Sequence, residues 1–175
     1  MQSRTVGLGP FADRLDDELR LSIALVKPAF DVVCSFAQEM ASRSLTIDLF
    51  ADEVNAKLPR FYANYFCPAA VGLNALAFDI SVDSAGHAEL FYAFPPVVMV
   101  GPLLAHMVAC KAQGIILYPD DATQPWFAEM ERVARSSRLL ASRASTDVLV
   151  KFVQRDKCIP VPTLWGLRMA YIDCR

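Results

Sequence analysis

Two adjacent prolines interrupt the longest apolar stretch of this chain. They are Pro95 and Pro96, and the sequence around them, residues 89–100, reads ELFYAFPPVVMV. A proline donates no backbone hydrogen bond and fixes its own φ, so a buried pair does not suit the interior of a continuous strand. The sequence therefore predicts a buried strand over residues 88–94 that ends at a rigid elbow.

Helical and strand patterns alternate on both sides of this elbow. Apolar residues recur at helical spacing from residue 19 to residue 40, and further helices are predicted from Pro102 to Gly114 and over residues 124–137. Residues 52–59 predict a helical turn or a short helix. Short β-rich runs predict the other strands, at residues 45–50, 73–80, 114–119, 137–142, 147–153 and 167–173.

This alternation predicts an α/β three-layer sandwich with a mostly parallel sheet and an antiparallel C-terminal edge. With 175 residues, of which 54% are hydrophobic and 21% charged, the chain is long enough for one domain with a substantial core. We expect residues 1–18 to be a flexible leader and residues 19–175 to form the domain. No run approaches the roughly 20 apolar residues of a membrane span, so no membrane partner is expected.

Charge gives little support for a nucleic-acid partner, because the formal net charge is −2. The one candidate basic patch consists of Arg132, Arg135, Arg138 and Arg143. In the predicted helix, the first two of these would share a face. The alternative is that this face is simply solvated.

The cysteines and histidines suggest no metal site. Five cysteines occur without a CxxC pair, and His87 and His106 lie far from them in the sequence. We expect most of these cysteines to be reduced and buried in an intracellular protein.

Candidate site residues follow the predicted strands. In open α/β sheets, ligands bind beyond the carboxyl ends of the strands. Asp48 follows one β-rich run, the two prolines follow the next, and the sequence YPDDATQPWF follows a third. A rigid proline elbow at such an edge could hold a flat ligand. The alternative is that the prolines only end a strand before a helix.

Read together, these segments resemble a known pattern. The matching blocks, in chain order, are DLFA at 48–51, Asn55, LPRF at 58–61, YAFPP at 92–96 and QPWF at 124–127. Their order resembles the methyltransferase-like segment that follows the RNase H region in DIRS-type tyrosine-recombinase retrotransposons. The resemblance covers about residues 19–143, and several blocks in order are more specific than any one of them.

That retroelement segment is in turn similar to the phage-type Dam DNA adenine methyltransferases. The similarity implies a Rossmann-like fold that binds S-adenosylmethionine, and a loop in which Asn or Asp precedes Pro-Pro and an aromatic residue. In such enzymes the polar side chain accepts hydrogen bonds from the adenine amino group and the aromatic ring stacks on the flipped base. By this resemblance, Asp48 and Asn55 would face a nucleoside pocket. Alternatively, Asp48 caps the following helix and Asn55 lies on its surface.

The sequence departs from this pattern at the elbow. Phe94 stands at the Asn/Asp position and Val97 at the aromatic position, although the DIRS-type pattern already carries Phe-Pro-Pro. Phenylalanine accepts no such hydrogen bond, and valine offers no stacking face. The catalytic motif, Phe94, Pro95, Pro96 and Val97, is therefore predicted to be degenerate. No GxGxxG motif occurs, and we expect no cofactor, or S-adenosylmethionine if the chain is active.

The sequence leaves several functions open. The first is a catalytically degenerate methyltransferase-like domain, derived from a retroelement, that acts as a structural or binding module in a protein or nucleoprotein assembly. The second is an active S-adenosylmethionine-dependent DNA adenine methyltransferase. The third is a nucleic-acid-binding module without catalysis. The expected location is intracellular, and nuclear if the chain is still linked to a retroelement.

Overall fold

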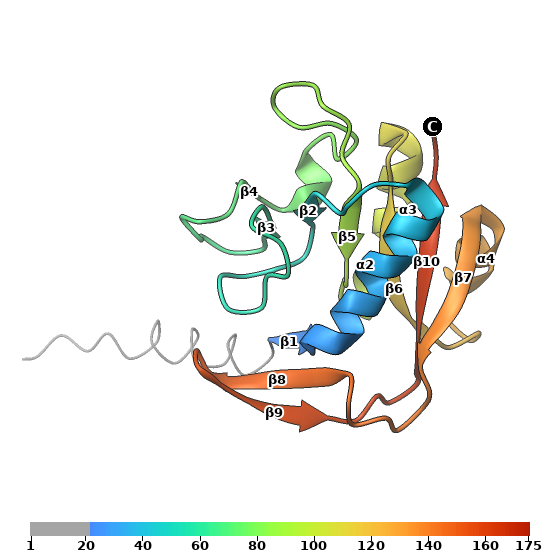
Figure 1. The fold of residues 1–175 in the computed structure, drawn as a ribbon. Helices are drawn as coiled ribbons and strands as arrows, with labels where there is room; N and C mark the ends of the chain where they lie inside the picture. Colours follow the sequence, from blue (N-terminus) through green and yellow to red (C-terminus); the bar gives the residue numbers. More distant parts are fainter. Residues whose placement is uncertain (1–21) are drawn as a thin grey trace, which may run out of the picture.

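The computed structural model describes residues 22–175 (Figure 1). The predicted leader, residues 1–18, lies outside the described residues. In chain order the elements are β1 Ile23–Leu25, α2 Lys27–Ala41, β2 Ile47–Asp48, β3 Tyr62–Ala63, β4 Gly72–Leu73, η1 Ala75–Ala77, β5 Phe91–Ala93, η2 Val97–Met99, α3 Val100–Cys110, β6 Gln113–Asp120, α4 Phe127–Val133, β7 Ala134–Ala141, β8 Leu149–Gln154, β9 Lys157–Val161 and β10 Gly166–Asp173.

The largest sheet of the described chain has five strands in the order β2-β5-β6-β10-β7. The first three strands are parallel to one another. The last strand of the chain, β10, is antiparallel to both of its neighbours, β6 and β7. Four strands therefore run in one direction and β10 runs in the other. By its pairings the sheet is mixed, with two parallel pairs and two antiparallel pairs.

Helices cover both faces of this sheet (Figure 1). Side chains that alternate along β5 and β6 point to opposite faces. On one face, Phe91 and Ile116 pack in the same cluster as Met107 of α3 and as residues of α4. On the other face, Tyr92 and Ile115 pack with α2. This arrangement confirms the α/β class.

The proline elbow lies where the sequence places it. Strand β5 ends at Ala93, and the chain passes through Pro95 and Pro96 into a short 3-10 helix and then α3. Farther toward the N-terminus, the predicted helix forms as α2 with Pro28 in its first turn, whereas residues 23–25 of the predicted helical range form β1. A strand forms within the predicted range 88–94, although it covers only Phe91–Ala93, and its end at the elbow is confirmed.

Several predicted elements differ from the structure in extent or type. Residues 73–80 form only the end of β4 and then a 3-10 turn, because Asn74 has a positive φ of 59° and its side chain accepts a hydrogen bond from the Leu76 N–H. Residues 52–59 form no regular helix, but the Ala56 N–H donates to the Asp52 carbonyl at 3.0 Å, so the helical turn predicted there is present. The helix predicted over residues 124–137 ends at Val133, because the next residues pair with β10 as β7.

Two smaller sheets flank the central one. Strands β1, β8 and β9 form an antiparallel sheet that lies across the lower end of the central sheet in Figure 1. That is the end at which the arrow of β5 points. The parallel pair β3–β4 forms a lobe beside β2. Arg60, just before this lobe, forms an ion pair with the buried Glu89, just before β5. Nη2 of Arg60 lies 2.6 Å from Oε1 of Glu89.

Gly114 is required by the close contact between β5 and β6. A Cβ atom at this position would lie 2.5 Å from Cδ2 of Phe91, which pairs with Gly114 across the two strands. By contrast, a Cβ at Gly101 of α3 would meet Trp126 at an ordinary 3.6 Å. Both glycines lie in regular elements, but only Gly114 has no room for a methyl group.

We predict that Gly114→Ala lowers the free energy of unfolding by about 1–3 kcal/mol through overpacking. Gly101→Ala serves as the matched control and is expected to raise it by about 0.5–1 kcal/mol, since alanine is the better helix former. Denaturant unfolding of both variants and the wild type measures these differences. Equal effects of the two substitutions would contradict this account of Gly114.

Candidate functional site

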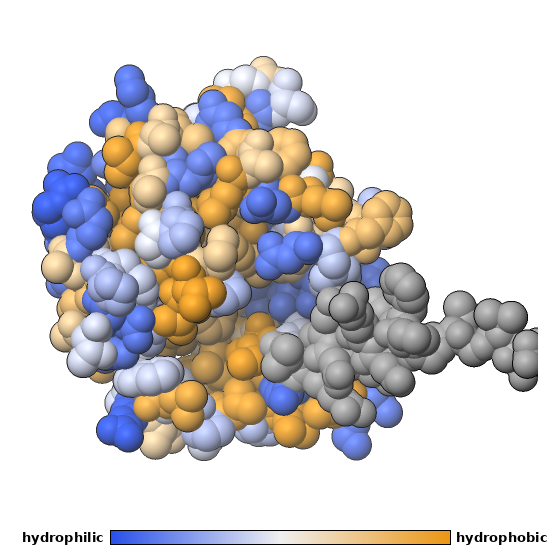
Figure 2. Space-filling model, turned by 180° about the vertical axis from the view of Figure 1, so that it is seen from behind, coloured by the Kyte–Doolittle hydropathy of each residue, from blue (hydrophilic) through white to orange (hydrophobic). Residues whose placement is uncertain are grey.

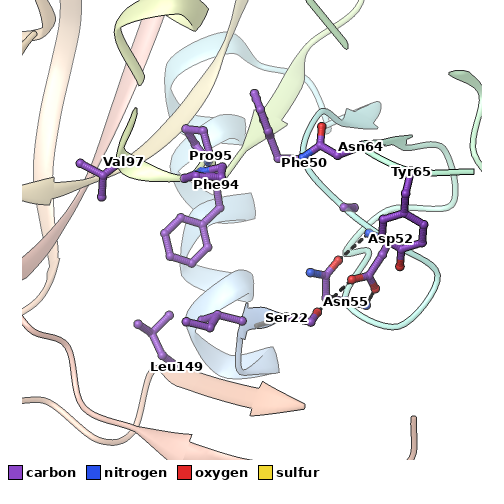
Figure 3. A pocket seen from close by; sticks show the side chains of 13 residues that line it. Ser22, Phe50, Asp52, Asn55, Asn64, Tyr65, Phe94, Pro95, Val97 and Leu149 are labelled. Atoms are coloured by element: carbon purple, nitrogen blue, oxygen red, sulfur yellow. Dashed lines mark hydrogen bonds between the residues drawn. The ribbon is translucent and has the colours of Figure 1, made fainter. Parts of the chain in front are cut away.

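A hollow of about 630 Å³ lies at the carboxyl ends of β2 and β5, next to the β1–β8–β9 sheet (Figure 3). The turn after β2 forms one wall and the proline elbow forms another. Leu149 of β8 and Tyr65 of the β3–β4 lobe complete the lining. Segments far apart in the sequence therefore meet at the edge of the sheet where α/β proteins bind their ligands.

The four residues of the predicted degenerate motif all line this hollow. They are Phe94, Pro95, Pro96 and Val97. Figure 3 shows the ring of Phe94 pointing into the space, toward Leu149. An apolar ring thus occupies the position at which the enzymes of the resembled pattern carry a hydrogen-bond acceptor.

The turn after β2 is held by a carboxylate that the sequence analysis missed. Oδ1 of Asp52 accepts hydrogen bonds from the N–H groups of Val54 and Asn55, at 2.7 and 2.8 Å. Its Oδ2 accepts one from Oγ of Ser22, at 3.0 Å. In return, the N–H of Asp52 donates to Oδ1 of Asn55, at 2.7 Å. The spacing of these residues in DEVN is a signal for such a turn, since Asp and Asn side chains bond nearby backbone groups.

Asn55, one of the two predicted nucleoside-facing residues, lines the hollow. Its side-chain oxygen is used by the turn, and no helix carries it. Asp48, the other predicted residue, lies behind the wall and is only 2% exposed. It shares a void of about 10 Å³ with Asn55 and Phe94, which is about the least that holds one water molecule. The structure therefore brings the predicted residues together, but Asp48 does not face the main hollow.

Asp48 also stabilises the turn. Its Oδ1 accepts a hydrogen bond from the N–H of Phe50 at 3.2 Å, and its Oδ2 accepts one from the N–H of Lys57 at 3.1 Å. Burial raises the pKa of this carboxyl to about 6, although the two backbone hydrogen bonds act against the increase. Burial likewise lowers the pKa of Lys57. Asp48 caps a turn, and the helix that it was predicted to cap does not form.

The four arginines of the candidate basic patch are separated. Arg132 lies on α4 and pairs with Glu129 at 2.5 Å. Arg138 lies on β7, pairs with Glu39 of α2 at 2.5 Å, and stacks over a phenylalanine of that helix. Arg135 and Arg143 are exposed, on β7 and after it. Because α2 and α4 cover opposite faces of the sheet, Arg132 and Arg138 do not share a face, and Arg132 and Arg135 do not share a helix.

The QPWF block lies on the other side of Val97. Gln124, Pro125 and Trp126 line a groove of about 800 Å³ between α3 and α4, to which Val97 also contributes. Trp126 is only 8% exposed and packs edge-on against Tyr118, with 6.0 Å between the ring centroids. On the face of the molecule in Figure 2, hydrophobic residues are interspersed with hydrophilic ones rather than gathered in one continuous patch.

Within residues 22–175, no group of three or more His, Cys, Asp or Glu side chains is placed to hold a metal ion. In the same part of the chain, no helix has the length and hydropathy to cross a membrane. The five cysteines are free thiols. Cys67 is the one that is buried, Cys158 is exposed, and the other three are partly buried, so the expectation that most are buried is wrong.

Comparisons with models of protein families and with curated proteins find no match for this chain. The resemblance to the DIRS-type segment therefore depends on the sequence blocks alone, and it stays a prediction.

We predict that the buried Asp48 makes the protein less stable as the pH rises. The folded-state pKa lies above the ordinary value of 3.8, so the folded chain holds a proton that the unfolded chain has released between about pH 4 and 6. The unfolding free energy should fall through this window by an amount on the order of 3 kcal/mol. Denaturant unfolding of the wild type and Asp48→Asn from pH 4 to 7 measures the two unfolding free energies. In their difference, the contributions of the other titrating groups cancel.

Asp121→Asn is the matched control for this experiment. Hydrogen bonds from Thr123 and Gln124 lower the pKa of the exposed Asp121, so its contribution to stability has the opposite pH dependence. A wild-type curve that stays parallel to that of Asp48→Asn would show that Asp48 has an ordinary pKa.

Proposed function

We propose that this chain is a catalytically degenerate methyltransferase-like domain, derived from a retroelement, that acts as a binding module in a protein or nucleoprotein assembly. The observation that carries the proposal is the hollow at the ends of β2 and β5. The DLFA block and the YAFPP block both line it, through Phe50 and Ala51 and through Phe94 to Pro96. Blocks that are distant in the sequence thus meet at one site.

The direction of the strands supports a Rossmann-like relationship. Strands β2, β5, β6 and β7 run the same way, and α3 and α4 connect β5 to β6 and β6 to β7. Strand-helix-strand units of this kind build the open α/β sheets whose ligands bind beyond the carboxyl ends of the strands. The reversed β10 is in keeping with the antiparallel C-terminal strands that the sequence predicts.

The chemistry of the hollow argues against methyl transfer. Transfer to an adenine amino group requires an acceptor that orients this group and excludes water. Phe94 supplies no acceptor, and the missing ring at Val97 removes a stacking platform worth about 1–3 kcal/mol per base. The nearby carboxylates, Asp48 and Asp52, already accept hydrogen bonds from the chain itself. Polar groups that could serve catalysis stabilise the turn instead.

Binding is the function that this lining still suits. The hollow has an apolar wall with the rings of Phe50, Phe94 and Tyr65, and the side-chain amides of Asn55 and Asn64 at one side. Ligand pockets of proteins are typically lined by apolar and aromatic side chains with a few polar groups. The separated arginines give less support to a nucleic-acid partner, because two of them are paired with glutamates.

Isothermal titration with S-adenosylmethionine tests the proposal most directly. We expect no binding at millimolar cofactor and no methyl transfer to DNA that contains adenine. The variant Phe94→Asn restores an acceptor at the elbow, and we expect it to stay inactive because Val97 still offers no ring. Micromolar binding by the wild type, weakened by Asn55→Ala, would overturn the degenerate assignment and support the active methyltransferase.

A further inference from the structure

A second hollow, of about 400 Å³, lies on the other side of Phe94 and Pro95, between the elbow and the segment that joins β9 to β10. Its walls are almost entirely apolar. At its rim, Trp165 and Leu164 are 43% and 69% exposed. Apolar side chains are thus left open to solvent around a concave space of the size that small ligands occupy.

One charged side chain lines this apolar space. Lys151 of β8 pairs with Ile23 of β1 on one side and with Ile159 of β9 on the other. The next row on the same face of this small sheet consists of Leu25, Leu149 and Val161. Side chains of a strand alternate between faces, so these two rows share one face, and Lys151 is the single residue in them that is not aliphatic.

Lys151 has no carboxylate partner among residues 22–175. The other polar side chain of note in the lining, the buried Thr163, is already engaged, since its Oγ1 donates to the carbonyl of Ser142 and accepts from the N–H of Ser145. The hollow therefore offers a ligand apolar walls and one positive charge whose hydrogen bonds are not used within the described chain.

We propose that this hollow binds a small amphipathic carboxylate, an alkyl chain with one negatively charged head group. The alkyl chain would lie against Leu149, Val161 and Trp165, and the carboxylate would pair with Lys151. An apolar body matches the walls, and a single anionic head matches the single cation. This hollow shares Phe94, Pro95 and Leu149 with the hollow of the proposed binding module, but the inference does not depend on that module.

Titration of the full chain with decanoate tests the inference, with the fluorescence of Trp165 as the reporter. Decanoate should shift the tryptophan emission to shorter wavelength, because the alkyl chain excludes water from the exposed ring. Trp165→Phe should abolish this shift, since the other tryptophan, Trp126, is buried in the core. Calorimetry of the same titration gives the dissociation constant.

Lys151→Met separates the charge from the apolar contacts, because it keeps an unbranched apolar stem. We expect it to weaken decanoate binding by about tenfold or more and to leave decanol binding unchanged. Lys157→Ala, which removes a charge on the exposed part of the neighbouring strand, is the matched control and should change the affinity by less than about threefold.

Three outcomes would overturn the inference. They are absence of decanoate binding at millimolar concentration, equal binding of decanoate and decanol by the wild type, and tighter binding of decylamine than of decanoate. The first would show that the hollow takes no alkyl ligand, and the other two that Lys151 does not select a carboxylate. None of them bears on the titration with S-adenosylmethionine.

Discussion

The site depends on two carboxylates at the end of β2. They hold the following residues in a turn, where no regular helix forms. Asp48 and Asp52 together accept hydrogen bonds from four backbone N–H groups of residues 50–57, which fold as a turn beside the elbow. Backbone donors that are left unpaired near an apolar hollow cost free energy, so the turn needs these acceptors. The arrangement has its own cost, which is visible in the raised pKa of the buried Asp48. The shape of the turn that lines the hollow is therefore fixed by Asp48 and Asp52.

The proline elbow is the second constraint, and several hollows meet at it. Phe94 and Pro95 contribute to the hollow at the ends of β2 and β5 and to the one beside Lys151, while Val97 contributes to both and to the groove between α3 and α4. Because proline fixes its φ, this junction loses little further conformational entropy when a ligand binds next to it. Ligands in neighbouring hollows would therefore contact some of the same residues.

The sequence predicts those parts of the fold that local patterns determine. The strand before Pro95, the buried β6 and the proline in the first turn of α2 all follow from apolar periodicity and from the geometry of proline. One error is local, at Asn74, and another arises where a distant segment decides the structure. Residues 134–137 continue a helical pattern, yet they pair with β10, some thirty residues later in the chain. At the site, Asn55 and the elbow could be predicted from the resemblance, whereas the role of Asp52 depends on Ser22 and on a turn that no periodicity shows.

The two hollows beside the elbow differ in the polar groups that they leave free for a ligand. At the ends of β2 and β5 the carboxylates serve the turn, and the elbow presents Phe94, so little polar chemistry is left for a ligand. On β8 the situation is reversed, because Lys151 interrupts an aliphatic face without a partner among the described residues. Burying a lysine stem along apolar walls is favourable only while its charge meets water or an anion. If an ancestral site at the elbow lost its chemistry, the unpaired charge next to it is the group with which the same scaffold could still select a ligand.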